Sequence, residues 1–136
     1  MEIKAIADPC MSEETVEFLQ RLHIPNIVKD VDVILNDPEI KAVVVCSPTD
    51  LHAEYSIKVA EAGKDVFVEK PVDYRIERVK EVIAAAKKSG VKLQVGFNRR
   101  FDHNHRAVYE AVRAGKIGKV NLVKISSRDP EPPTID

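Results

Sequence analysis

Short unbroken apolar runs alternate along this chain with stretches in which apolar residues recur every three or four positions. The run 42–46 is apolar throughout and rich in valine, which is typical of a strand buried on both faces of a parallel sheet. From about Asp50 the spacing becomes that of a helix, and Gly63 suits the left-handed residue that ends one. The residues with helical spacing are Leu51, Tyr55, Val59 and Ala62. The pattern therefore predicts a strand followed by an amphipathic helix.

The same alternation predicts the other elements. Strands are expected at 3–7, 26–29, 65–68 and 92–97, and a strand with one solvated face at 120–126. Helices are expected after Ser12, after Asp30 or Asp32, after Asp73, and around 107–114. Strands that alternate with helices favour an α/β fold with an open parallel sheet and right-handed crossovers.

Composition and charge narrow the class of protein. With 136 residues, of which 44% are hydrophobic and 32% charged, the chain has the balance of one globular domain with a real core. A formal net charge of -1 and the lack of a basic stripe do not indicate nucleic-acid binding. No apolar run approaches the roughly 20 residues that span a membrane, and the first residues do not resemble a signal peptide. A cytoplasmic protein is expected.

Candidate chemistry follows the expected strand 65–68, which ends on Glu69, Lys70 and Pro71. Ligands of open parallel sheets bind beyond the carboxyl ends of the strands, so the Lys70 ammonium would project into that crevice. The segments 46–52 and 96–102 also follow expected strands and would share this edge. The alternative is that Glu69 and Lys70 form a solvated pair on a loop, because short motifs often match by chance.

These three segments, in this order and spacing, resemble the Gfo/Idh/MocA family of nicotinamide-dependent oxidoreductases, in particular its inositol 2-dehydrogenase branch. The resemblance implies a Rossmann-derived fold, the cofactor NAD and a polyol substrate, with Lys70 as the catalytic residue that contacts the nicotinamide ribose and the reacting hydroxyl. It also implies cofactor-binding roles for Asp8, Ser47, Thr49, His52 and Glu69, and substrate-binding roles for Arg99 and Asp129.

Several of these residues have structural alternatives. Asp8 could instead form the turn before Pro9, and Arg99 could lie in a solvated basic turn. Thr49 is expected to cap the helix that begins at about Asp50, with His52 in its first turn. His103 and His105 are expected at the surface and not in a metal site, because they lack further partners at ligand spacing. Cys10 and Cys46 are expected to be reduced.

Two features of the family pattern do not occur in this sequence. Its five glycines form no G-x-G-x-x-G turn, the element whose backbone N–H groups hold a pyrophosphate. The resemblance also implies an acid and a histidine at D-x-x-x-H spacing, and that pattern is absent. Weak or no NAD binding and no activity are therefore expected for this chain alone. The alternative is a non-catalytic α/β module for folding or self-association.

The resemblance has a topological consequence. The strand order 3-2-1-4-5-6 without its first strand closes to the flavodoxin-like order 2-1-3-4-5. The strand 3–7 would then pair with 42–46. The rival expectation is a domain swap or a homodimer through the exposed strand edge, in which another chain fills the gap. A domain of residues 1–118 is expected, followed at 119–136 by the first strand and tail of a substrate domain.

Overall fold

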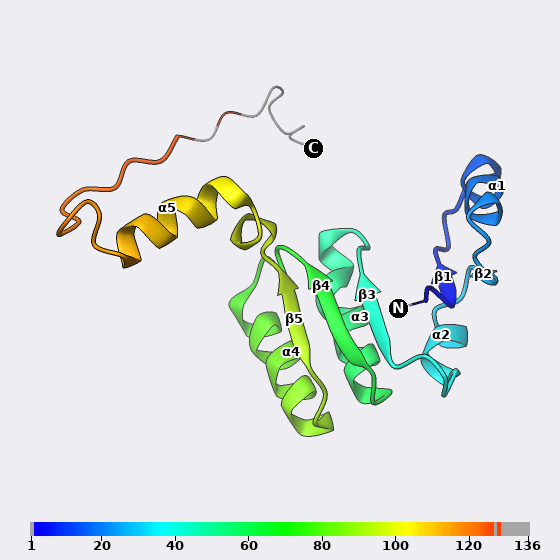
Figure 1. Ribbon diagram of the computed structural model, residues 1–136. Helices are drawn as coiled ribbons and strands as arrows, with labels where there is room; N and C mark the ends of the chain where they lie inside the picture. Colours follow the sequence, from blue (N-terminus) through cyan, green and yellow to red (C-terminus); the bar gives the residue numbers. More distant parts are fainter. Residues whose placement is uncertain (1, 127, 129–136) are drawn as a thin grey trace. The chain divides into compact units, whose positions relative to one another are not determined.

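The computed structural model describes residues 2–126 and residue 128 (Figure 1). The chain divides into two compact units, 1–97 and 98–136. The expected domain boundary after residue 118 stays a prediction, although the first compact unit ends earlier, at Phe97.

Strands and helices alternate through the first unit. Its elements are β1 (Ala5–Ala7), α1 (Glu13–Arg21), β2 (Asn26–Val28), α2 (Asp32–Asn36), β3 (Ala42–Val45), α3 (Thr49–Glu61), β4 (Asp65–Glu69), α4 (Ile76–Ser89) and β5 (Leu93–Gly96). The second unit contains the 3-10 helix η1 (Asn98–Arg100) and α5 (His103–Arg113). All observed strand pairs are parallel, which confirms the predicted α/β class.

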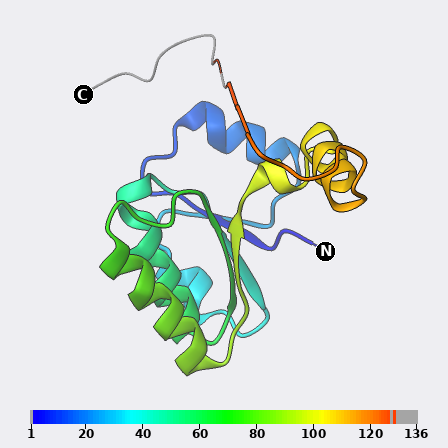
Figure 2. The same ribbon diagram turned by 90° about the vertical axis from the view of Figure 1, so that its left-hand side faces the viewer.

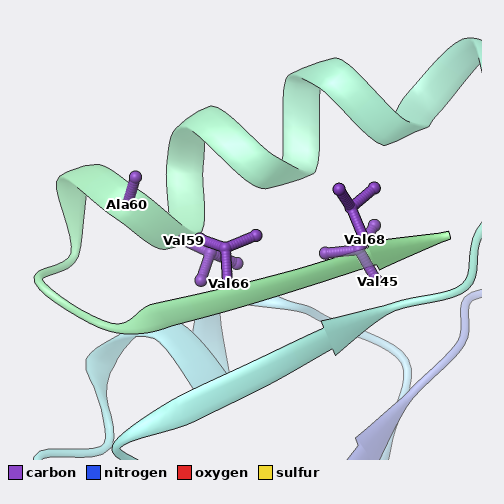
Figure 3. Close-up of a cluster of buried hydrophobic side chains, with 5 residues drawn as sticks. All are labelled: Val45, Val59, Ala60, Val66 and Val68. Atoms are coloured by element: carbon purple, nitrogen blue, oxygen red, sulfur yellow. The ribbon is translucent and has the colours of Figure 1, made fainter. Parts of the chain in front are cut away.

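The core lies between a three-stranded sheet, in the order β3-β4-β5, and the helices α3 and α4. Both helices lie on the same face of this sheet (Figures 1 and 2). Val45 of β3 and the alternate residues Val66 and Val68 of β4 lie between the sheet and α3, as Figure 3 shows. The buried cluster consists of Val45, Val59, Ala60, Val66 and Val68.

The opposite face of β3 differs from the prediction. Val44 is 62% exposed, and Ala42 is exposed as well. The expectation that the run 42–46 is buried on both faces is therefore wrong. A continuous apolar run is compatible with two covered faces, but α3 and α4 cover only the face that carries Val45.

Local signals place the helix ends. The Ser12 hydroxyl accepts a hydrogen bond from the Thr15 N–H at 3.2 Å, which confirms the predicted start of α1. Gly90 ends α4 with φ +70°, a left-handed conformation that costs glycine little because it has no Cβ.

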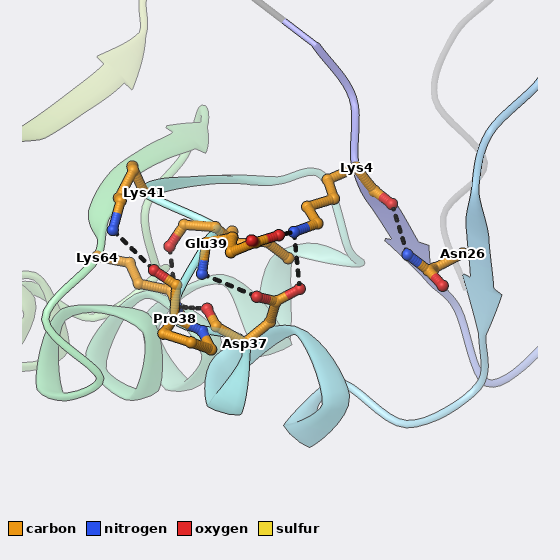
Figure 4. Close-up of polar contacts among 8 residues, drawn as sticks. Lys4, Asn26, Asp37, Pro38, Glu39, Lys41 and Lys64 are labelled. Atoms are coloured by element: carbon orange, nitrogen blue, oxygen red, sulfur yellow. Dashed lines mark hydrogen bonds and ion pairs between the residues drawn. The ribbon is translucent and has the colours of Figure 1, made fainter.

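The predicted closure of the sheet is not observed. Among residues 2–126, β1 pairs only with β2, and β3 pairs only with β4. A side-chain contact joins the start of β1 to the turn before β3: the Lys4 ammonium forms ion pairs with Asp37, at 3.6 Å, and with Glu39 (Figure 4). β1 thus reaches this turn through a side chain and not through a hydrogen-bonded ladder.

The expected strand at 120–126 is not formed in the described part of the chain. Its apolar side chains are exposed: Val120, Leu122, Val123 and Ile125. Alternating apolar residues favour a strand only when a neighbouring strand can satisfy its N–H and C=O groups, and this segment has no such neighbour among the described residues.

Candidate functional site

Three strand ends form the candidate site. Within the parallel sheet, Val45 of β3 lies opposite Val68 of β4, and Glu69 of β4 lies opposite Gly96 of β5. The residues that follow each strand therefore emerge at one edge, as predicted for parallel strands. Lys70 follows β4 and is exposed. Its ammonium makes no hydrogen bond or ion pair within residues 2–126, so it is available to a ligand.

The Glu69 carboxylate lies against the backbone of the neighbouring strand. A Cβ atom added to Gly96 would stand 2.9 Å from Glu69 Oε1, closer than real Cβ contacts. The Lys70 N–H donates a long hydrogen bond of 3.3 Å to Glu69 Oε2. Cys46 is exposed, but partial desolvation of its thiol, and then the Glu69 charge, raise the pKa of the thiol above its usual value. The thiol is therefore held in its protonated, less nucleophilic form.

The substitution Gly96→Ala is expected to raise the pKa of Cys46 further. The new methyl group leaves no room for the Glu69 carboxylate against β5, and we expect the carboxylate to move to the other side of the central strand β4, towards the end of β3 and Cys46. The measurement is the pH dependence of thiol alkylation in a Cys10→Ser background. Glu69→Gln, which removes the charge, is expected to lower the pKa and to abolish the effect of Gly96→Ala. An unchanged or lower thiol pKa in Gly96→Ala alone would contradict this account.

His52 is buried beneath the site. It lies in the first turn of α3 and is 3% exposed. Its Nδ1 lies 2.7 Å from the Pro71 carbonyl oxygen and its Nε2 lies 2.7 Å from the Ser47 carbonyl oxygen. Both ring nitrogens therefore face main-chain oxygens of this chain. The cofactor-binding role expected for His52 stays a prediction, and this geometry offers a different role.

Ser47 and Thr49 lie at the start of α3, and both are partly exposed. The prediction that Thr49 caps this helix is wrong: Thr49 is its first residue, Pro48 is the N-cap, and no side-chain hydrogen bond is made there. Proline at Pro48 supplies an extended backbone in place of a capping side chain. The Thr49 hydroxyl is thus not used as a cap.

Asp8 follows β1, in the other sheet of the first unit. Its carboxylate accepts a hydrogen bond of 2.8 Å from the Cys10 N–H, across Pro9. The turn-forming alternative is therefore observed. A carboxylate has two acceptor oxygens, so the second oxygen of Asp8 can accept a hydrogen bond from a ribose hydroxyl. The turn-forming role and the expected cofactor-binding role are therefore compatible.

The second unit contains a chain of polar contacts around Asp102. The Asp102 Oδ1 accepts hydrogen bonds from the His105 N–H at 2.9 Å and from His105 Nδ1 at 2.8 Å. Arg99 Nη1 lies 3.3 Å from His105 Nε2. Arg99 thus stands beside His105, and its expected contact with a polyol stays a prediction.

Asp102 caps α5, and these contacts lower the pKa of its carboxyl from 3.8 to about 2, chiefly through the hydrogen bond from the His105 N–H. Because the pKa is lower in the folded chain, the stabilisation is present above pH 3.8 and is lost as the pH falls through about 2. The Asp102 side-chain carbon and the His105 amide are expected to titrate together by NMR with that midpoint. In Asp102→Asn the pH-dependent shift of the His105 amide should vanish. If the shift persists, the titration belongs to another group.

Three further expectations concern other parts of the chain. Asp129, the second residue expected at the substrate, lies outside the described residues. His103 and His105 are exposed, as predicted, and the described part of the chain contains no group of three or more potential metal ligands. Within the same residues, no helix has both the length and the apolar character needed to cross a bilayer.

Comparison with known proteins shows which family and which relatives this chain resembles. A family model described as an oxidoreductase family with an NAD-binding Rossmann fold matches residues 1–97. An uncharacterized oxidoreductase of Bacillus subtilis, YrbE, is 45% identical over 136 residues, which are all of this chain and 40% of that protein. Myo-inositol 2-dehydrogenase of Thermotoga maritima is 43% identical over 120 residues, covering 88% of this chain and 36% of the relative.

Solved structures show the same fold. A probable dehydrogenase from Thermotoga maritima superposes with a TM-score of 0.81 at 40% identity, over 87% of this chain and 36% of that protein. A scyllo-inositol dehydrogenase from Lactobacillus casei, with bound NAD(H) and scyllo-inositol, gives 0.78 at 28% identity, over 86% of this chain and 34% of that protein. The chain thus spans less than half the length of the relatives it matches.

Proposed function

Because this chain belongs to the Gfo/Idh/MocA family of oxidoreductases, with an NAD-binding Rossmann fold, we propose that it carries the lysine-bearing part of an NAD-dependent inositol or sugar-polyol dehydrogenase site. The observation that carries the proposal is the shared edge of β3, β4 and β5, where Lys70 presents an ammonium without a partner among the described residues. The similarity to two inositol dehydrogenases supports the substrate class.

The residues of this edge suit a nicotinamide cofactor in part. NAD, when bound, supplies the acceptor for the hydride that leaves the alcohol carbon. The Lys70 ammonium can donate hydrogen bonds to a ribose hydroxyl and to the reacting hydroxyl, and the Ser47 and Thr49 hydroxyls lie at the positive end of the 13-residue helix α3. Asp8 and Glu69 complete the proposed cofactor contacts, whereas Arg99 and Asp129 are proposed to contact the polyol.

Two groups that the reaction needs are absent from these 136 residues: a pyrophosphate-binding turn and a proton acceptor at D-x-x-x-H spacing. The pyrophosphate has no G-x-G-x-x-G turn to bind it. Oxidation of an alcohol also releases a proton, and an ammonium has donors but no acceptor for it, while no D-x-x-x-H pair is present. We therefore propose that this chain alone binds NAD weakly and does not complete hydride transfer.

NADH titration tests this proposal. Binding, followed through NMR shifts at millimolar NADH and through nicotinamide fluorescence, is expected to be weak and to weaken severalfold in Lys70→Met. The matched control is Lys80→Met, an exposed lysine of α4, which should leave binding unchanged. Equal effects of the two substitutions would refute a site at Lys70. Saturable binding near micromolar NADH, or NADH formation from myo-inositol, would refute the proposed inactivity.

Self-association is the second candidate function. The observation that favours it is the edge strand β3, which pairs on one side only among the described strands and carries the exposed Val44. A homodimer through such an edge would satisfy its unpaired N–H and C=O groups. Sedimentation velocity at two concentrations should then show a concentration-dependent dimer, and a monomer at both concentrations would refute this function.

A further inference from the structure

We infer that His52 is a positioning residue for Lys70. Its ring bridges the loop that follows β3 and the loop that follows β4, and so holds the main chain at Pro71, directly after Lys70. The bridge consists of the two contacts of 2.7 Å from its ring nitrogens to the carbonyl oxygens of Ser47 and Pro71. These partners lie 5 and 19 residues from His52 in the sequence, so the ring ties together segments that the chain itself does not hold together.

Burial makes this bridge stiff. His52 is 3% exposed, so water cannot readily replace either contact. Both partners are acceptors, and a histidine ring is the side chain that can present N–H groups in two directions from one rigid plane.

The bridge acts on the residue that the proposed function needs most. Lys70 lies between Glu69, whose carboxylate rests against Gly96, and Pro71, whose carbonyl oxygen meets the His52 ring. The chain is thus held on both sides of Lys70. That this placement serves a nicotinamide site rests on the proposed function, whereas the bridge itself rests on the contacts alone.

Two substitutions separate the two halves of the bridge. The amide of glutamine can occupy the place of the ring Nε2, and the amide of asparagine the place of Nδ1. His52→Gln therefore keeps the contact to Ser47 and loses that to Pro71, and His52→Asn does the reverse. A residue that merely fills space would give the same result for both variants.

Amide hydrogen exchange of the intact chain reads the two loops separately. Where the first loop enters α3, the Leu51 N–H of the first helical turn donates to the Pro48 carbonyl oxygen at 2.9 Å, and in the second loop the Arg75 N–H donates to Asp73 Oδ1 at 2.8 Å. In the sheet the Val66 N–H donates to the Lys92 carbonyl oxygen at 2.8 Å and reports the core. These three amides report the loops and the sheet in one experiment.

Exchange at Arg75 is expected to rise about tenfold in His52→Gln, with Leu51 unchanged, and the opposite is expected in His52→Asn. Val66 should be unchanged in both. The control is Ser56→Ala, one helical turn further along α3: Ser56 is fully buried and its hydroxyl has no hydrogen-bond partner among the described residues, so no reporter should change.

Three results would overturn the inference. The first is that both variants change exchange at Leu51 and Arg75 in the same way, and the second is that exchange changes at neither amide. The third is that exchange rises equally at Leu51, Arg75 and Val66, which would mean a general loss of stability. Failure of the proposed function would appear separately, as an NADH titration that does not depend on Lys70, and it would leave the exchange pattern of the bridge unaffected.

Discussion

The substitution Lys64→Met is expected to lower the free energy of unfolding by about 2 kcal/mol. Lys64 is 4% exposed, and its ammonium donates to the carbonyl oxygens of Asp37 at 2.6 Å and Ile40 at 2.9 Å (Figure 4). Methionine can fill the space of the aliphatic stem, but it leaves the Ile40 oxygen without a donor and leaves the Asp37 oxygen only the 3.3 Å hydrogen bond from the Ile40 N–H. Methionine also avoids the desolvation cost of a buried ammonium. This gain offsets only part of the loss, because the two carbonyl groups solvate the ammonium well in the folded chain.

The neighbouring Lys41 provides a matched control. Its ammonium also donates to a carbonyl oxygen of the same turn, that of Pro38 at 2.7 Å, but Lys41 is exposed and water can take its place. Lys41→Met is therefore expected to change the free energy of unfolding by less than about 0.5 kcal/mol. Urea unfolding of both variants measures the difference. Similar losses for the two lysines would show that burial does not govern this turn.

A loss of about 2 kcal/mol is also expected for Val68→Ala. Val68 is 0% exposed on the central strand β4 and belongs to the cluster that packs beneath α3 (Figure 3). Removing two methyl groups gives up their transfer free energy and leaves a cavity that the surrounding valines fill only in part. Since small domains are stable by only about 5–15 kcal/mol, this loss is readily measured.

Val44→Ala is the control for this prediction. It makes the same chemical change in the same sheet, at a residue that is 62% exposed. The change in unfolding free energy is expected to stay within about 0.5 kcal/mol. A comparable loss at Val44 and Val68 would mean that the uncovered face of β3 is buried in solution.

Much of the candidate site could be predicted from the sequence. The segments after three successive strands, each recognisable by its composition, had to meet at one edge once the sheet was parallel, and the structure places Glu69 beside Gly96 accordingly. The role of His52 could not be predicted in this way. A histidine in a first helical turn has no local signal for a carbonyl partner 19 residues away. Threonine is a common N-cap residue and proline is not, so the sequence favours Thr49 over Pro48 as the cap.

By itself, the sequence determined the alternation of strands and helices, the parallel class and the helix ends at Ser12 and Gly90, because periodicity and capping act over a few residues. Only the tertiary structure decided that β1 does not pair with β3 among the described strands, that one face of β3 is uncovered, and that Lys64 and His52 bind distant carbonyl groups. These outcomes depend on which segments approach one another in space. The free energy of such contacts cannot be inferred from the spacing of neighbouring residues in the sequence.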